Sequence, residues 1–475
     1  MRGGLQMELW VHWYEVVQMF QGACSRRRTF FWLIVSLAMF CLPHDEFGVA
    51  GLVRAGHFKS VCYRGLLRLF HSSAVNLHSL TRIWIGVALR LFKVVTLNGR
   101  PLVIADGVKA PKEGRKMPGV KSLHQESGNN SKPEFIMGHS LQVLALLVHG
   151  CSSQILAVPL VARIHEGLKF TNRDKRTLPR KLADMISEIA SIFSTPIILV
   201  ADAYYACSSL INQLLRDGHN LISRVRSTAV AYYPATSEPK RRGRPRKYGT
   251  KVRLRDLFCE TTMFLAASVS LYGEDNVSIR YRSLDLLWMP LRRLIRFVLV
   301  EIEGKGKAIL MSTDLTLSAL EIIEGYGRRF RIEVTFRAAI HSIKAFAYRF
   351  WMMGMTPIRR GSGTQYLHRA GREYCAAVRQ KMAAYHLWIQ LAMIAQGLLQ
   401  HLAVNYREAV WAGFFCFMRT IRKDLAPSEQ VVAAALREQL VNFPQIADGD
   451  VKLRKFLVDL HKISALEHQK TRDTG

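Results

Sequence analysis

Three acidic side chains, far apart in the chain, stand in contexts that could bring them to one catalytic site. Asp106 follows the apolar run 101–105, and Asp202 follows the apolar run 197–201. Apolar runs of this length predict buried strands, so each aspartate is expected at the end of a strand, where an ordinary turn is the alternative. With Glu333 as a third carboxylate, they could hold two Mg²⁺ ions about 3.5–4 Å apart, which suits phosphoryl transfer.

The context of Glu333 strengthens this interpretation. Tyr326 and Arg329 precede it in a Tyr-x2-Arg-x3-Glu pattern, at the start of a helix predicted over 328–351 from the spacing of apolar residues. Arg329 and Glu333 are four residues apart, so a surface ion pair worth under about 0.5 kcal/mol is the simpler explanation. Opposite two strand-end aspartates, we interpret Glu333 as a metal ligand.

The overall charge predicts a polyanionic partner. The 475 residues include 67 Lys and Arg against 36 Asp and Glu, which gives a net charge of +31. Such a field attracts nucleic acid or an anionic membrane. The longest apolar run, 29–42, has 14 residues, whereas a membrane-spanning helix needs about 20, so a buried helix is expected. No export signal is predicted, and eight scattered cysteines without a CxxC pair predict reduced thiols rather than disulfides or zinc.

The order of predicted elements indicates an α/β fold. Strand-like runs at 101–105, 141–148 and 154–161 precede a helix at 181–193 and the strand at 197–201. This order suits the mixed sheet of an RNase H-like core, interrupted by a β-rich insertion and flanked by helical regions. The predicted regions are a helical N-terminal DNA-binding region (1–95), the first part of the core (96–225), the insertion (226–315), the second part of the core (316–360) and a helical C-terminal region (361–475).

A basic segment within the insertion is a second candidate for DNA binding. Residues 240–247 resemble an AT-hook, whose Gly-Arg-Pro-Arg core holds an extended backbone. Arg242, Arg244 and Arg246 could then enter a narrow A·T minor groove. A solvated basic loop is the alternative interpretation, and it too would contact phosphates.

Taken together, these motifs resemble those of a known family. The chain is similar to DDE transposases of bacterial cut-and-paste insertion sequences, in the group with a Tyr-x2-Arg-x3-Glu-x6-Lys signature and an RNase H-like core with a β insertion. The resemblance implies that Asp106, Asp202 and Glu333 are the catalytic, metal-binding triad. It also implies that Tyr326 and Arg329 contact transposon-end DNA near the cleaved strand.

The signature is incomplete, because Ile340 occupies the position of its lysine. Lys344, one predicted helical turn further on, is the candidate replacement for that DNA contact. The resemblance further implies two Mg²⁺ ions, which Mn²⁺ could replace, and double-stranded DNA partners, both transposon ends and target. A homodimer in a synaptic complex, no membrane association and a cytoplasmic, nucleoid-associated location in bacteria are expected on the same ground.

The predicted function is therefore metal-dependent DNA cleavage at transposon ends, followed by transfer of the freed strand into target DNA. An RNase H-like nuclease or Holliday-junction resolvase would use the same carboxylates without strand transfer. A non-catalytic DNA-binding protein would need only the charge and the basic segment, and a membrane-associated protein is the third alternative. Strand transfer from a precleaved end, loss of cleavage in Asp106→Ala, and flotation with neutral lipids distinguish these alternatives.

Overall fold

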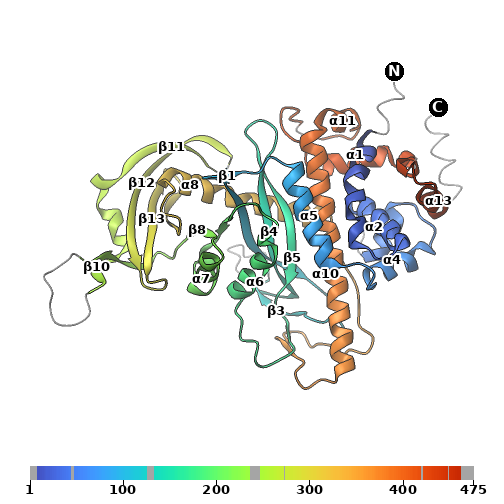
Figure 1. Cartoon of the computed structure of the whole chain (residues 1–475), viewed down its shortest axis with the longest axis horizontal. Helices are drawn as coiled ribbons and strands as arrows, with labels where there is room; N and C mark the ends of the chain where they lie inside the picture. Colours follow the sequence, from blue (N-terminus) through green and yellow to red (C-terminus); the bar gives the residue numbers. More distant parts are fainter. Residues whose placement is uncertain are drawn as a thin grey trace.

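A large mixed sheet forms the centre of the protein, with helices from both ends of the chain packed beside it (Figure 1). The computed structural model describes residues 8–43, 48–125, 133–235, 246–271, 273–418, 421–447 and 449–461. The principal sheet runs in the order β10-β9-β12-β13-β14-β8-β7-β2-β4-β3, with β5 paired to β4, β11 to β12 and β1 to β2. Seven strands of this sheet come first in the chain: β1 (Thr96–Leu97), β2 (Arg100–Pro111), β3 (Lys121–His124), β4 (Phe135–His149), β5 (Ile155–Ile164), β7 (Ile198–Ala201) and β8 (Asn220–Arg224). Strand β6 (Leu168–Lys169) lies in a separate small sheet.

Five of these strands make an RNase H-like core. They lie in the order β5-β4-β2-β7-β8, and β2 is antiparallel to β4 but parallel to β7. Helix α6 (Leu178–Ala190) connects β5 to β7 through β6, and α7 (Ser208–Arg216) connects β7 to β8. Parallel neighbours need such crossover helices, whereas the antiparallel strands follow one another directly. The predicted RNase H-like mixed sheet is confirmed.

The inserted strands extend this core sheet rather than forming a second one. Strand β14 pairs with both β13 and β8, which joins the two parts of the sheet. A tight turn joins the last two inserted strands, with positive φ angles of 70° at Gly304 and 93° at Gly306 that glycine adopts readily. The inserted strands are β9 (Val230–Pro234), β10 (Tyr248–Arg253), β11 (Leu265–Leu271), β12 (Glu274–Trp288), β13 (Arg293–Ile302) and β14 (Gly306–Ser312).

Helices from the two ends of the chain pack against each other (Figure 1). These helices are α1 (Glu8–Val17), α2 (Arg27–Phe40), α3 (Gly48–Ala55), α4 (Cys62–Phe70), α5 (Leu77–Leu91), α10 (Arg372–Asn405), α11 (Arg407–Ala412), α12 (Glu429–Glu438) and α13 (Val451–Leu460). Helix α10 contacts α2, α5 and β5, so it links the helical layer to the sheet. Among the described residues it alone is long and apolar enough to cross a membrane, but 94% of its apolar window is buried inside the protein, as in a core helix.

The segment that carries Glu333 differs from the continuous helix predicted over 328–351. Helix α8 (Ala319–Gly327) is followed by the short 3₁₀ helix η5 (Arg328–Phe330) and by α9 (Arg331–His341). Helix α9 stops because Lys344 has a φ of +56°, a left-handed conformation that a helix does not tolerate. The apolar spacing continues past this point because Ile343 and Phe346 are buried in the following loop.

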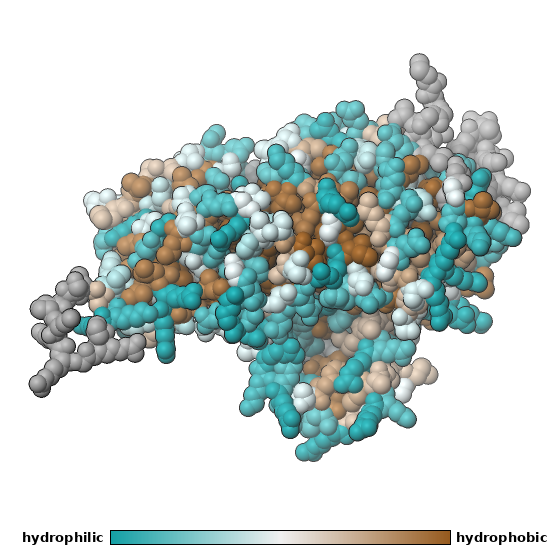
Figure 2. Space-filling model, in the orientation of Figure 1, coloured by the Kyte–Doolittle hydropathy of each residue, from teal (hydrophilic) through white to brown (hydrophobic). Residues whose placement is uncertain are grey.

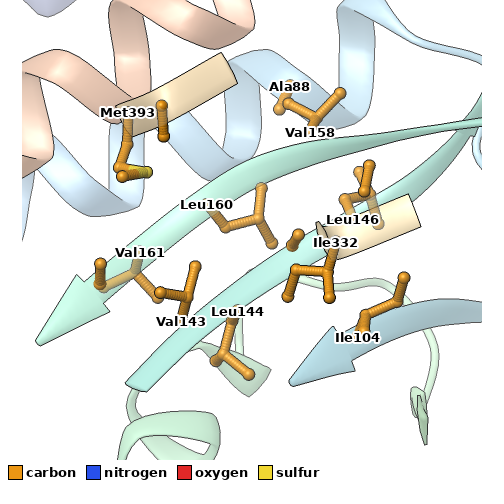
Figure 3. Packing of buried hydrophobic residues seen from close by; sticks show 14 of the residues in the cluster. Ala88, Ile104, Val143, Leu144, Leu146, Val158, Leu160, Val161, Ile332 and Met393 are labelled. Atoms are coloured by element: carbon orange, nitrogen blue, oxygen red, sulfur yellow. The ribbon is translucent and has the colours of Figure 1, made fainter. Parts of the chain in front are cut away.

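Buried apolar side chains hold α9 on the sheet. Ile332 lies among Ile104, Leu144 and Leu146 in the packed interior (Figure 3). The hydroxyl of Thr335 donates to the carbonyl oxygen of Ala157 on β5 at 2.7 Å. These contacts fix the rotation of α9 about its axis. Glu333, the residue after Ile332, therefore points away from the core. The five predicted regions share this interior, and the division into domains stays a prediction.

Candidate active site

Two of the predicted carboxylates lie side by side on the sheet. Ala105 of β2 is in register with Ala201 of the parallel strand β7, so the residues that follow, Asp106 and Asp202, emerge at the same level. Strand β7 ends there, as predicted, and the Asp202 carboxylate caps the next turn by accepting from the Tyr204 N–H at 3.0 Å. The prediction that Asp106 ends a strand is wrong, because β2 remains paired with β4 as far as Pro111.

Arg329 connects the third carboxylate to this pair. Its Nη1 lies 2.7 Å from Oδ2 of Asp106, and its Nη2 lies 3.1 Å from Oε1 of Glu333. The Asp106 and Arg329 side chains are each only 19% exposed, whereas the Glu333 side chain is 46% exposed. The i,i+4 ion pair considered from the sequence is therefore present, and the same guanidinium also binds the buried aspartate.

The electrostatics show how closely these charges interact. Burial raises the pKa of Asp106; Arg329 and the Gly107 N–H oppose that rise, and the negative charges of Asp202 and Glu333 add to it. Burial alone would lower the pKa of Arg329, but Asp106 and the other negative groups around it hold this pKa above its ordinary value. The three carboxylates thus repel one another, and Arg329 is the positive charge that offsets the repulsion.

Three carboxylates around one exchangeable positive charge are a suitable donor set for divalent metal ions. Mg²⁺ and Mn²⁺ prefer oxygen ligands, and all three side chains supply only oxygen. In the described part of the chain, no three Asp, Glu, His or Cys side chains are close enough together to hold a metal ion as they stand. Arg329 lies between Asp106 and Glu333. The side chains therefore suit a divalent ion in the kind of donor they offer, and such an ion would have to replace this guanidinium.

The remaining residues of the signature, and Lys344 as the candidate replacement for its lysine, follow the predictions only in part. Tyr326 lies at the end of α8, close enough to Arg329 to raise its pKa. Ile340 and Lys344 both line a hollow of about 420 Å³ next to the part of β2 that follows Asp106. The expectation that Lys344 lies one helical turn after Ile340 is wrong, because α9 ends at His341. The two side chains nevertheless face the same space.

Of the three AT-hook-like arginines, the structure describes only one. Arg246 is exposed at the start of the segment that leads into β10. Arg242 and Arg244 lie outside the described residues. Their role as minor-groove contacts stays a prediction.

A polar cluster near the aspartates, formed by Gln142, Tyr205 and His165, was not predicted. Gln142 Nε2 donates to the Tyr205 hydroxyl at 3.2 Å, and Oε1 of the same side-chain amide accepts from Nδ1 of His165. Tyr205 is buried, and burial raises its pKa, with Asp106 and Asp202 adding to the rise. The signal in the sequence was Gln142 itself, an amide within the apolar run 141–148. A buried polar residue in such a run needs a partner.

The fold and the site define an RNase H-like protein with acidic residues gathered at the centre of its sheet. Comparison of the sequence with protein families identifies a more specific group. The DDE superfamily endonuclease family matches residues 20–263, which is 244 of the 475 residues. The chain therefore belongs to the DDE superfamily endonucleases. The match includes Asp106 and Asp202 and ends before Glu333.

Two further comparisons add little. None of the curated proteins compared matches the chain. Among solved structures, the chain is similar to a piggyBac transposase in a synaptic complex with hairpin DNA, at 11% identity and a TM-score of 0.38. That alignment covers 96% of this chain and 84% of that chain. At this level the likeness supports no argument about function.

Proposed function

We propose that this DDE superfamily endonuclease is a transposase of the bacterial insertion-sequence type. It cleaves DNA at transposon ends and joins the freed 3′-OH to target DNA. The observation that carries the proposal is the convergence of Asp106 and Asp202, on adjacent parallel strands, with Glu333 through the shared guanidinium of Arg329. This arrangement gathers acidic oxygen donors from two strands and one helix around a single cationic position.

Each residue of the site has a distinct task in this proposal. Asp106, Asp202 and Glu333 would hold divalent ions, Mg²⁺ or Mn²⁺, which when bound would supply charge to activate the attacking hydroxyl group and to stabilise the leaving oxygen. Arg329 keeps the carboxylates together before DNA arrives and then pairs with a phosphate, for which its planar guanidinium is well shaped. The partly exposed Glu333 completes the ligand set from the side that faces solvent.

The partners follow from charge and from the incomplete signature. The net charge of +31 favours double-stranded DNA, and Tyr326 and Arg329 are proposed to contact the transposon end. Lys344 lines the same hollow as Ile340, which supports its role as the substitute phosphate contact. Arg242, Arg244 and Arg246 are proposed to contact the A·T minor groove. Joining two ends requires a synaptic homodimer, and we propose a nucleoid-associated location in the cytoplasm.

A precleaved substrate tests the proposal. Purified protein is incubated with Mg²⁺, target plasmid and the terminal DNA that borders the coding sequence, ending in a free 3′-OH. A transposase joins this end to the plasmid, and Asp106→Asn does not. Cleavage of intact ends without any joined product would instead establish the alternative, a nuclease or resolvase built on the same core.

A further inference from the structure

A separate lobe projects from the core beside the candidate active site. We call it the basic lobe and define it as residues 111–125, 165–177 and 349–382, which lie in the lower part of Figure 1. Backbone hydrogen bonds tie the three segments together: Met352 N donates to Lys116 O at 2.9 Å, and Leu367 N donates to Lys169 O at 2.7 Å. The lobe has its own small apolar core around Met355.

The basic lobe concentrates positive charge. Its 62 residues contain 15 Lys and Arg but only 4 Asp and Glu, a net charge of +11 out of +31 for the whole chain. Hydrophilic side chains surround its small apolar centre (Figure 2). The exposed arginines of the lobe are Arg115, Arg173, Arg176, Arg359, Arg360, Arg369, Arg372 and Arg379.

Much of this charge is not neutralised by the protein. No described carboxylate lies within ion-pairing distance of Arg359, Arg360 or Arg369, whereas Arg176 is paired with Asp174 at 2.9 Å. Exposed arginines that no carboxylate neutralises can pair with the phosphates of a polyanion, and their summed field attracts one. Two large aromatic side chains, Trp351 and Tyr366, are each 60% exposed among them. Basic and aromatic side chains together are typical of a nucleic-acid surface.

The lobe is connected to the catalytic carboxylates by two of the elements that carry them. Strand β2 runs from Asp106 directly into the lobe at Pro111, and the chain after Glu333 leaves α9 and enters the lobe at Arg349. The hollow of about 420 Å³ is lined by residues from 109–117 and from 340–351, which include the basic residues Lys109, Lys344 and Arg349. A continuous basic path therefore leads from the carboxylates to the lobe.

We propose that the basic lobe grips the phosphate backbone of duplex DNA on one side of the scissile phosphate. Pro111 lies five positions after Asp106 in β2, which is about 16 Å at about 3.3 Å per residue. DNA rises about 3.4 Å per nucleotide, so the lobe contacts the backbone from about five nucleotides beyond the cleaved bond. The proposal deepens the proposed function and rests on it, because it assumes that the carboxylates act on DNA.

Binding and footprinting without cleavage test the proposal. The probe is the terminal duplex that borders the coding sequence, with Ca²⁺ in place of Mg²⁺. The lobe variant carries Arg359→Gln, Arg360→Gln and Arg369→Gln. The matched control removes three exposed lysines of the segments after α10, with Lys423→Gln, Lys452→Gln and Lys455→Gln. Thermal melting of both variants checks that they fold.

The expected result is specific to the lobe variant. The slope of log K against log salt falls by about 2.7, because three phosphate contacts each contribute about 0.9. Protection against hydroxyl radicals disappears on the side of the lobe, starting about five nucleotides beyond the cleaved bond. Protection at the cleaved bond itself remains. The same three positions changed to lysine keep both the slope and the protection.

Three results would overturn the inference. The control variant could weaken binding as much as the lobe variant, which would leave only total charge as the cause. The lobe variant could keep the full footprint. The lobe could instead mediate salt-sensitive retention on phosphatidylserine vesicles while DNA affinity stays unchanged in the variant. Failure of the wild-type protein to bind the terminal duplex would contradict the proposed function itself, which separates the two failures.

Discussion

Arg329→Gln tests whether this guanidinium occupies the place of a metal ion. The change keeps a polar side chain but removes the positive charge that Asp106 and Glu333 share at 2.7 Å and 3.1 Å. Two opposite effects are expected. The metal-free protein loses stability because Asp106 is left buried beside two other carboxylates. Divalent ions bind more tightly because they no longer displace a bonded arginine.

The magnitudes follow from the burial of the two contacts. A hydrogen bond to a charged group contributes about 1.5–3 kcal/mol, and the Asp106 contact, at 19% exposure, is near the middle of that range. The Glu333 contact adds under about 1 kcal/mol because its carboxylate is half exposed. A loss of about 2 kcal/mol lowers the melting temperature of a chain of this size by about 2 °C. The gain in Mn²⁺ affinity is expected to be about tenfold, which corresponds to about 1.4 kcal/mol.

The assay is titration of Mn²⁺ without DNA, followed by electron paramagnetic resonance, with melting in EDTA as the second measurement. Arg328→Gln is the matched control. It removes the same positive charge, but Arg328 pairs with Glu324, at 3.6 Å, and not with the three carboxylates. Unchanged or weaker Mn²⁺ binding in Arg329→Gln would refute the idea that the guanidinium and the metal ion compete. An equal gain in Mn²⁺ affinity in both variants would mean that the loss of one positive charge, and not the position of Arg329, causes the effect.

The remaining predictions concern the ligands, the signature and a buried lysine. Asp202→Asn lowers cleavage at least about 10³-fold with little change in DNA affinity, whereas the surface change Asp217→Asn leaves cleavage intact; gel assays of both variants measure this. Ile340→Lys adds a phosphate contact to the hollow and raises the salt slope of DNA binding by about 0.9, and an unchanged slope would mean that the hollow does not receive DNA. Burial lowers the pKa of Lys112 from 10.5 to about 7, so the unfolded chain holds the extra proton between these values and stability rises with pH across this window. Lys112→Met removes that rise, which urea denaturation at pH 7 and pH 9.5 would detect.

The strands of the core could be predicted because they are buried on both faces. The segments before Asp106 and Asp202 consist almost entirely of apolar residues, as strands buried on both faces do. Two such strands that each lead to an aspartate were enough to predict that the two carboxylates could share one site. The parallel pairing of β2 with β7 then brought the two side chains together.

The parts that could not be predicted depend on contacts between distant segments. The continuation of β2 past Asp106 depends on its pairing with β4, which no local pattern specifies. Apolar spacing alone could not locate the end of α9, because residues such as Phe346 are buried in a loop as well as on a helix. The bridge from Arg329 to Asp106 spans 223 residues, so only the fold reveals it.

Locating the metal ions tests the central claim most directly. Crystals of the protein bound to terminal duplex DNA are soaked in Mn²⁺, and anomalous diffraction then locates the ions. We expect ions coordinated by Asp106, Asp202 and Glu333, with Arg329 moved from Asp106 to a DNA phosphate. Ions bound away from these carboxylates, with Arg329 still between Asp106 and Glu333, would contradict it.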